Sequence, residues 1–188
     1  MKLKVLADNN TFIDQYYLGE PAVSYYIEDG DTKILFDTGY SDVFIQNAEK
    51  MNINLNELDK IIISHGHDDH TGGLKYLFEK INNKNIELIA HKDCFNKKIF
   101  DDLYIGTSMS EQELKEVCKL NLSKTPVKIT ENIFFLGEIP QINDFEKRKP
   151  IGKYEYENQF IDDFVQEDTA IVHKGDKGLF IVTGFSHS

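Results

Sequence analysis

The stretch IIISHGHDDHTGGL, residues 61–74, places three histidines within six positions directly after a β-branched apolar run. The run Ile61–Ile63 is typical of a buried strand, and the Gly72-Gly73 pair lets the backbone turn sharply after the histidines. A buried strand therefore delivers a dense group of nitrogen and oxygen donors to the loop at its C-terminal end. Such a group is far more specific for metal binding than a single histidine on an apolar face.

The spacing of the donors in this loop divides them into two pairs. In extended backbone, residues i and i+2 point the same way, so His65 and His67 can converge on one metal ion. Asp69 and His70 follow a turn and can face a second ion, as in two-metal sites with ions about 3.5–4 Å apart. The alternative is a solvated polar loop in which histidines cluster by chance.

Length and composition predict a single globular domain over residues 1–188. The formal net charge of −11 repels polyanions, so we expect neither nucleic acid nor an anionic membrane as a partner. The N-terminus lacks the apolar core of a signal peptide, and Cys94 and Cys118 form neither a disulfide framework nor a CxxC zinc site. We therefore expect a soluble, cytoplasmic protein.

Strand-like and helix-like stretches predict an α/β or α+β sandwich and leave open which of the two it is. Helices are expected at residues 41–51, 74–81 and 111–120, the last opened by a Ser110-x-x-Glu113 capping box. Residues 137–166 predict a long polar loop near the site. Strands are expected at residues 2–7, 22–28, 32–37, 61–63, 86–90, 127–129, 133–136, 169–173 and 179–183.

The HxHxDH pattern at residues 65–70, with LFDTG at residues 35–39, resembles the metallo-β-lactamase superfamily. GEIP at 137–140, DFE at 144–146 and GLFIVTGFSH at 178–187 look like the branch of the archaeal dihydropterin-ribofuranosyl-aminobenzene phosphate synthases. The resemblance implies a four-layer αβ/βα sandwich with a metal site at the edge between two β-sheets. We expect this chain to lack the C-terminal elements of that sandwich.

The resemblance also implies roles for the loop donors. It implies that His65 and His67 bind one metal ion and that Asp69 and His70 bind the other. Asp37 would brace the site from behind, because a metal-bound imidazole needs an acceptor that holds its loop or its second nitrogen. The alternative for Asp37, which ends a predicted strand, is an acid that caps a turn.

Four residues outside the loop complete the candidate set. His187 matches the histidine of the TG-x-SH motif and is the next candidate ligand; the alternative is a frayed terminal residue. His91 and Glu138 are candidates for substrate contact, with a structural histidine and a solvated surface acid as alternatives. Phe185, also a candidate for substrate contact, stands where the branch usually carries cysteine, so a bulky ring replaces a donor or a small residue.

The ligand count leaves the nature of the site open. Two ions bridged by hydroxide need roughly six protein ligands, at three per ion. The loop and His187 supply five, and the family carries a further metal-binding histidine that would lie beyond Ser188. A trimmed chain, a short or degenerate protein, and a partner chain that completes the site are the explanations left.

From these residues we expect a metal-dependent hydrolase. One or two ions, zinc first with iron or manganese as alternatives, would activate water, and Asp69 would orient it. The expected substrate is a phosphoester, a lactone or another small ester-like molecule, and the branch points to a pterin-related one, although a family does not fix a substrate. The alternative is a degenerate or truncated member that binds metal in a structural or regulatory role; a di-iron redox site is weaker. A homo-oligomer is compatible with either reading.

Overall fold

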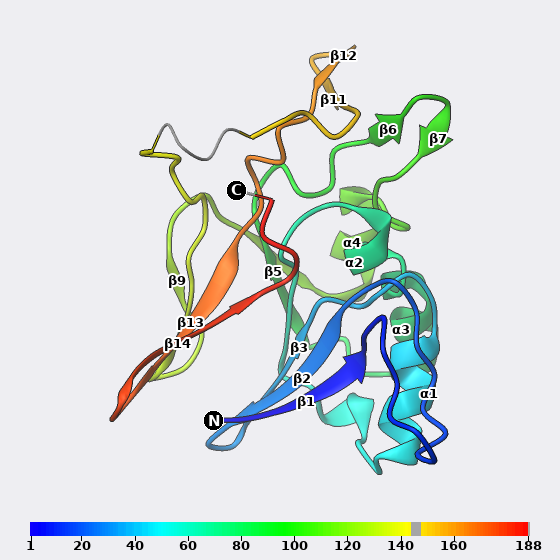
Figure 1. Ribbon diagram of the computed structural model, residues 1–188, viewed down its shortest axis with the longest axis vertical. Helices are drawn as coiled ribbons and strands as arrows, with labels where there is room; N and C mark the ends of the chain where they lie inside the picture. The colour runs from blue at the N-terminus through cyan, green and yellow to red at the C-terminus, as the bar shows by residue number, and fades with distance from the viewer. Residues whose placement is uncertain (144–147, 188) are drawn as a thin grey trace.

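The structure, a computed structural model, describes residues 1–143 and 148–187 (Figure 1). The helices in this part of the chain are α1 (Val43–Lys50), α2 (Asp68–Thr71), α3 (Leu74–Lys80) and α4 (Glu111–Val117), with a 3-10 turn, η1 (Leu55–Glu57). The strands are β1 (Lys2–Ala7), β2 (Ser24–Asp29), β3 (Thr32–Phe36), β4 (Lys60–Ile62), β5 (Glu87–Ala90), β6 (Lys98–Phe100), β7 (Leu103–Tyr104), β8 (Lys119–Leu122), β9 (Val127–Lys128), β10 (Ile133–Phe135), β11 (Lys153–Tyr156), β12 (Gln159–Asp162), β13 (Ala170–Gly175) and β14 (Gly178–Thr183). None of the described helices is long and apolar enough to cross a membrane.

The central sheet has the strand order β1-β2-β3-β4-β5-β8. The first three strands pair antiparallel, whereas β3, β4, β5 and β8 run parallel, with Leu35 opposite Ile61 and Ile61 opposite Leu88. Parallel strands are covered on both faces, which explains why their sequences are nearly continuous apolar runs. Because parallel strands end at the same edge, the residues that follow β3, β4 and β5 meet there.

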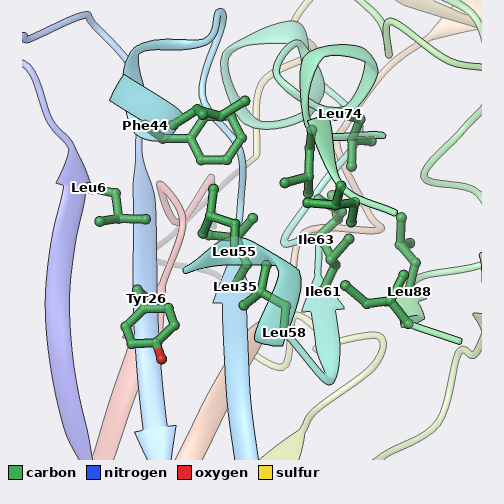
Figure 2. Close-up of a cluster of buried hydrophobic side chains, with 14 of the residues drawn as sticks. Leu6, Tyr26, Leu35, Phe44, Leu55, Leu58, Ile61, Ile63, Leu74 and Leu88 are labelled. Carbon is green, nitrogen blue, oxygen red and sulfur yellow. The ribbon is translucent and has the colours of Figure 1, made fainter. Parts of the chain in front are cut away.

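One face of the central sheet carries the helices. Leu35, Ile61 and Leu88 point to this face and belong to one buried cluster with Phe44 of α1 and Leu74 of α3 (Figure 2). Burying such a side chain contributes roughly 1.5–3 kcal/mol relative to leaving it exposed. The apolar stripes of α1 and α3 are therefore held against the strands that lead to the histidine loop.

The opposite face of the same strands packs against a second sheet of order β14-β13-β10-β9. Phe36, Ile62 and Ile89 meet Phe135 and Ile171 in a second buried cluster. Successive residues of a strand point to opposite faces, so each parallel strand contributes to both cores. Figure 1 shows the resulting order, with the helices on one side of the central sheet and the second sheet on the other.

A third, small sheet of order β12-β11-β6-β7 lies apart from these layers (Figure 1). Its strands β11 and β12 fall inside residues 137–166, so the prediction of one long loop there is incomplete. The stretch KYEYENQFID turns on Glu157 and Asn158, both at positive φ, and forms a hairpin whose first strand pairs with β6. The sequence signal of this hairpin is weak because all of its residues are half-buried or exposed, so no apolar alternation marks it.

The α/β or α+β sandwich expected from the sequence is confirmed as a mixed α/β fold, with one helical layer and two packed sheets in the described residues. The predicted helix 111–120 is too long. The Ser110–Glu113 capping box does open α4, but the helix ends at Val117, and residues 119–122 form β8. Parallel pairing of Leu120 with Leu88 at the sheet edge outweighs the local helical spacing.

Replacement of a residue at the centre of the two-sheet core should be costly. Ile62 is fully buried, so Ile62→Ala is expected to lower the free energy of unfolding by about 2–5 kcal/mol through lost contacts and a residual cavity. The matched control is Ile13→Ala at an exposed position, with an expected change within about 0.5 kcal/mol. Urea unfolding of both variants measures the difference, and equal losses would contradict the assigned core.

Candidate metal centre

The histidine loop is folded tightly against two neighbouring loops, and its glycines explain how. A Cβ on Gly66 would lie 1.9 Å from the backbone oxygen of Cys94, so no other residue fits between the two site histidines that flank it. Likewise, a Cβ on Gly73 would lie 2.2 Å from the backbone oxygen of Thr38. The loop after β4 can therefore pass close to the loops after β5 and β3, which fixes the directions of its side chains.

Four histidines converge at this edge of the central sheet. The ring of His65 lies 4.8 Å from that of His67, 4.1 Å from that of His70 and 4.7 Å from that of His187, measured between centroids. Nε2 of His65 is 3.2 Å from Nε2 of His187, although the two residues are 122 positions apart. The C-terminal end of β14 thus lies beside the end of β4.

The donors form two groups that share one residue. One group consists of His65, His67 and His187, and the other of His65, Asp69 and His70; within each group the donor atoms lie within 4.8 Å of one another. Nε2 of His70 is also 3.3 Å from Oδ2 of Asp69. Imidazole nitrogens and a carboxylate are donors that suit zinc, and iron or manganese as well.

The burial of these donors indicates that they fit a metal ion. Nε2 of His67 and Nε2 of His70 are buried, and neither has a hydrogen-bond partner among the described residues. A buried polar atom without a partner costs free energy, and native structures contain few of them. A metal ion bound by these nitrogens would remove that cost.

Asp37 holds the loop from behind. Its carboxylate is fully buried and accepts three hydrogen bonds of 2.7 Å, from the backbone N–H and the hydroxyl of Ser64 and from Nδ1 of His70. The bond to Nδ1 leaves Nε2 of His70 to face the other donors. Asp37 itself adopts φ of 58°, a left-handed conformation that aspartate tolerates better than most residues.

A second carboxylate, which the sequence did not identify, lies on the other side of the site. Oδ2 of Asp168 accepts the backbone N–H of His187 at 2.7 Å, and its Oδ1 lies 3.6 Å from Nδ1 of His65. Burial raises the pKa of Asp168 to about 6. Asp168 just precedes β13, and no other candidate metal ligand lies near it in the sequence. It comes close to the histidine loop only in the folded chain.

A third group beside the site is a buried ion cluster, which the sequence also did not identify. Nζ of Lys98 lies 2.5 Å from Oδ2 of Asp163 and 2.6 Å from Oε1 of Glu167, and all three side chains are buried. Oδ2 of Asp163 is in turn 3.9 Å from Nε2 of His67. Lys98 follows two other polar residues in the sequence and carries no sign of burial.

The remaining candidates lie in two places. Phe185 packs beside the donors, with its ring 5.3 Å from that of His187 and 6.4 Å from that of His70. His91, at the end of β5, is buried; its Nδ1 accepts the N–H of Asp93 at 3.2 Å, and its Nε2 is 3.5 Å from Oε2 of Glu138. His91 and Glu138 therefore form a pair of their own. The DFE motif at 144–146 lies outside the described residues.

The pKa values of the site histidines shift in opposite directions. Burial, together with the charges of the neighbouring histidines, holds the pKa of His65 well below its usual value and lowers that of His187 to about 4. Burial also opposes the charged form of His70, but Asp37 and Asp69 overcome it and raise the pKa of His70 to about 10. In the metal-free chain, one proton on His70 thus balances part of the surrounding negative charge.

Comparison with known proteins identifies the class. Residues 18–187 match the model of the metallo-beta-lactamase superfamily, and the chain belongs to this superfamily. Among named relatives, it is 34% identical to 7,8-dihydropterin-6-methyl-4-(beta-D-ribofuranosyl)-aminobenzene-5'-phosphate synthase of Methanocaldococcus jannaschii, over 100% of this chain and 68% of that protein. It is also 31% identical to an uncharacterized protein of the same organism, over 99% of this chain and 70% of the relative.

Solved structures agree with this assignment. The crystal structure of Tm1679, described as a metal-dependent hydrolase of the beta-lactamase superfamily, superposes with a TM-score of 0.79 at 27% identity. The match covers 98% of this chain and 66% of that one, so this chain spans about two thirds of the length of its relatives. A quorum-quenching N-acyl homoserine lactone lactonase, at 14% identity and a TM-score of 0.54 over 86% of this chain and 59% of that one, shares the fold.

The raised pKa of His70 predicts how the stability of the chelator-treated protein depends on pH. The folded chain binds this proton more tightly than the unfolded chain, whose histidine has the ordinary pKa of 6.5. The resulting stabilisation is fully present below pH 6.5 and is lost as the pH rises toward about 10. Stability should therefore fall over this range, as measured by urea unfolding in the presence of a chelator.

Two variants isolate the cause of this slope. Asp37→Asn removes the charge next to Nδ1 of His70 and should flatten the slope, whatever its effect on overall stability. Asp42→Asn changes an exposed acid at the start of α1 and should leave the slope unchanged. A slope that persists in Asp37→Asn would show that another group causes it.

Proposed function

We propose that the chain is a metal-dependent hydrolase that acts on a small ester-like substrate such as a phosphoester or a lactone. The observation that carries this proposal is the convergence of four histidines and Asp69, with buried nitrogens that lack hydrogen-bond partners. A bound zinc ion, or iron or manganese in its place, would supply a Lewis acid and lower the pKa of a water to about 7.

Different side chains would bind the metal ions and orient the water. His65, His67 and His187 would hold one ion. Asp69 and His70, next to them, would hold the second. Burial opposes the charged form of Asp69, but His70, whose Nε2 lies 3.3 Å from Oδ2 of Asp69, overcomes it and lowers the pKa of Asp69, so its carboxylate is ionised and can orient a water or accept its proton.

Other groups would shape the site around these donors. The exposed ring of Phe185 covers one side of His187 and offers an apolar surface to a substrate. Asp37 and Asp168 would keep the imidazoles of His70 and His65 in the required orientation, so that little reorganisation is needed when the reaction occurs.

The comparisons guide the choice of substrate. The named relative is a synthase whose name contains a dihydropterin and a ribofuranosyl phosphate, whereas the solved relative is described as a hydrolase. A pterin-related or phosphorylated-ribose compound is therefore the first substrate class to test, alongside simple esters. We also propose a cytoplasmic location, and a homo-oligomer is compatible with the proposal. We propose no nucleic acid or membrane partner, because a net charge of −11 repels polyanions.

A second candidate is a family member that binds metal without turnover. The observation in its favour is the shared His65, because the two donor groups together contain five different residues rather than the roughly six that two ions use. A single bound ion with a structural or regulatory role would suit this set.

Metal analysis and hydrolysis assays separate the two candidates. Protein prepared with zinc should carry one or two ions and hydrolyse generic phosphodiester, lactone or thioester substrates, or a dihydropterin phosphate. His67→Ala removes a donor and should lower kcat/KM by at least about 100-fold. His173→Ala, on β13 outside both donor groups, is the matched control and should retain activity.

The outcomes are distinct. Bound zinc without turnover of any substrate favours the non-catalytic candidate. Protein that stays metal-free in excess zinc contradicts both candidates.

A further inference from the structure

Two cavities lie beside the metal centre and share part of their lining. The first, of about 350 Å³, is lined in part by Asp163, whose Oδ2 lies 3.9 Å from Nε2 of His67. The second, of about 310 Å³, reaches Arg148, and Phe164 and Gln166 line both cavities. Sites for small molecules have volumes of about 300–1,000 Å³. The two cavities therefore offer room for a substrate that extends from the metal donors toward Arg148.

The segment between β12 and β13 forms the lining that the cavities share. Phe164 and Gln166 are exposed, whereas their neighbours Asp163 and Val165 are buried. In Figure 1 this segment passes beside the C-terminal end of the chain, which carries His187. Phe164 thus presents an apolar ring, and Gln166 an amide, to a molecule bound next to the metal centre.

Arg148, the single arginine of the sequence, lies at the end of the second cavity. Its Nη1 donates to the backbone oxygen of Val165 at 3.5 Å and its Nη2 to that of Ile139 at 3.4 Å, both longer than a typical hydrogen bond. Its Nε is buried without a hydrogen-bond partner, and no carboxylate of the described residues forms an ion pair with the guanidinium. The two backbone contacts orient the guanidinium but leave its charge uncompensated.

An uncompensated guanidinium in a cavity suits an anionic ligand. Its planar donors match the oxygens of a phosphate or a carboxylate, which can accept two parallel hydrogen bonds from it. A buried N–H without an acceptor costs free energy, and a bound anion would remove that cost. Glu138 also lines this cavity, but Nζ of Lys124 lies 3.0 Å from its carboxylate and compensates its charge.

We propose that Arg148 binds a phosphate or carboxylate group in the part of the substrate that is not hydrolysed. The substrate class is then narrower than a small ester, because the ester or lactone must carry such an anionic group at a distance from the reacting bond. The anion would lie at Arg148 and the body of the substrate against Phe164. The inference rests on the proposed function, which places the reacting bond at the metal donors.

The single arginine allows a test on the unmodified, zinc-loaded chain. Phenylglyoxal, a reagent that modifies arginine, should label Arg148, and mass spectrometry of peptides locates and counts the label. A bound anion covers the guanidinium, so inorganic phosphate or acetate at about ten times its dissociation constant should slow labelling about 10-fold. Chloride at the same ionic strength is the control. Protection by phosphate alone assigns a phosphate group, and protection by acetate alone assigns a carboxylate. Equal labelling rates in all three salts overturn the inference.

This measurement does not depend on turnover, so the two proposals can fail separately. Protection of Arg148 in a protein that hydrolyses nothing supports the anion site while the proposed function fails. Hydrolysis by a protein whose Arg148 is not protected supports the proposed function and overturns the anion site.

A matched pair of variants tests the effect on substrate choice. Arg148→Gln removes the charge and should lower kcat/KM for a lactone that bears a carboxylate by at least about 10-fold, with little change for a neutral lactone. Lys149→Gln removes a charge at the next, exposed position and should leave both values unchanged. Equal losses for the two lactones would show a purely structural role and overturn the inference. If Arg148→Gln does not fold, or neither lactone is hydrolysed, the labelling of the unmodified chain decides.

Discussion

The carboxylate of Asp37 joins the end of one parallel strand to the loop after the next, and the site depends on this junction. It binds the backbone and the hydroxyl of Ser64 and also Nδ1 of His70, so a single buried group fixes both ends of the histidine loop. Thr38, the next residue, donates its N–H and its hydroxyl to the backbone oxygen of His70. The parallel register of β3 and β4 brings these partners together, and the apolar cores on both sides of the sheet hold the register in place.

The distribution of charge around the histidines is uneven in a way that a net charge of −11 does not reveal. Carboxylates stand on the outer side of the imidazoles, and the donor nitrogens face inward toward one another. Without an ion, burial and the charges of the neighbouring histidines disfavour further protonation, which is why the pKa values of His65 and His187 are depressed. The same arrangement lowers the cost of placing a dication among them, because the surrounding acids are already fixed in position.

The parts of this arrangement that local sequence predicts are those built from neighbouring residues. The run Ile61–Ile63 marks the strand, and the spacing that follows it marks the donors. Local sequence could not identify Asp163, Asp168 and Lys98 as neighbours of the histidines. Each of them reaches the site only through contacts between segments that are far apart in the chain. Lys98, for instance, is buried only because Tyr154 of β11 pairs opposite it and the turn after β12 folds over it. The end of α4 was predicted wrongly for a similar reason, because residues 119–122 pair with β5 at the edge of the sheet instead of continuing the helix.

The placement of His187 beside His65, across 122 positions of chain, has a thermodynamic consequence. An ion held by both residues would act as a cross-link between β14, an edge strand, and β4, at the centre of the fold. Such a link binds the folded chain in preference to the unfolded one, so each tenfold rise in free metal above the dissociation constant would add about 1.4 kcal/mol of stability. The concentration of free metal would then determine how firmly β14 is held to the rest of the fold.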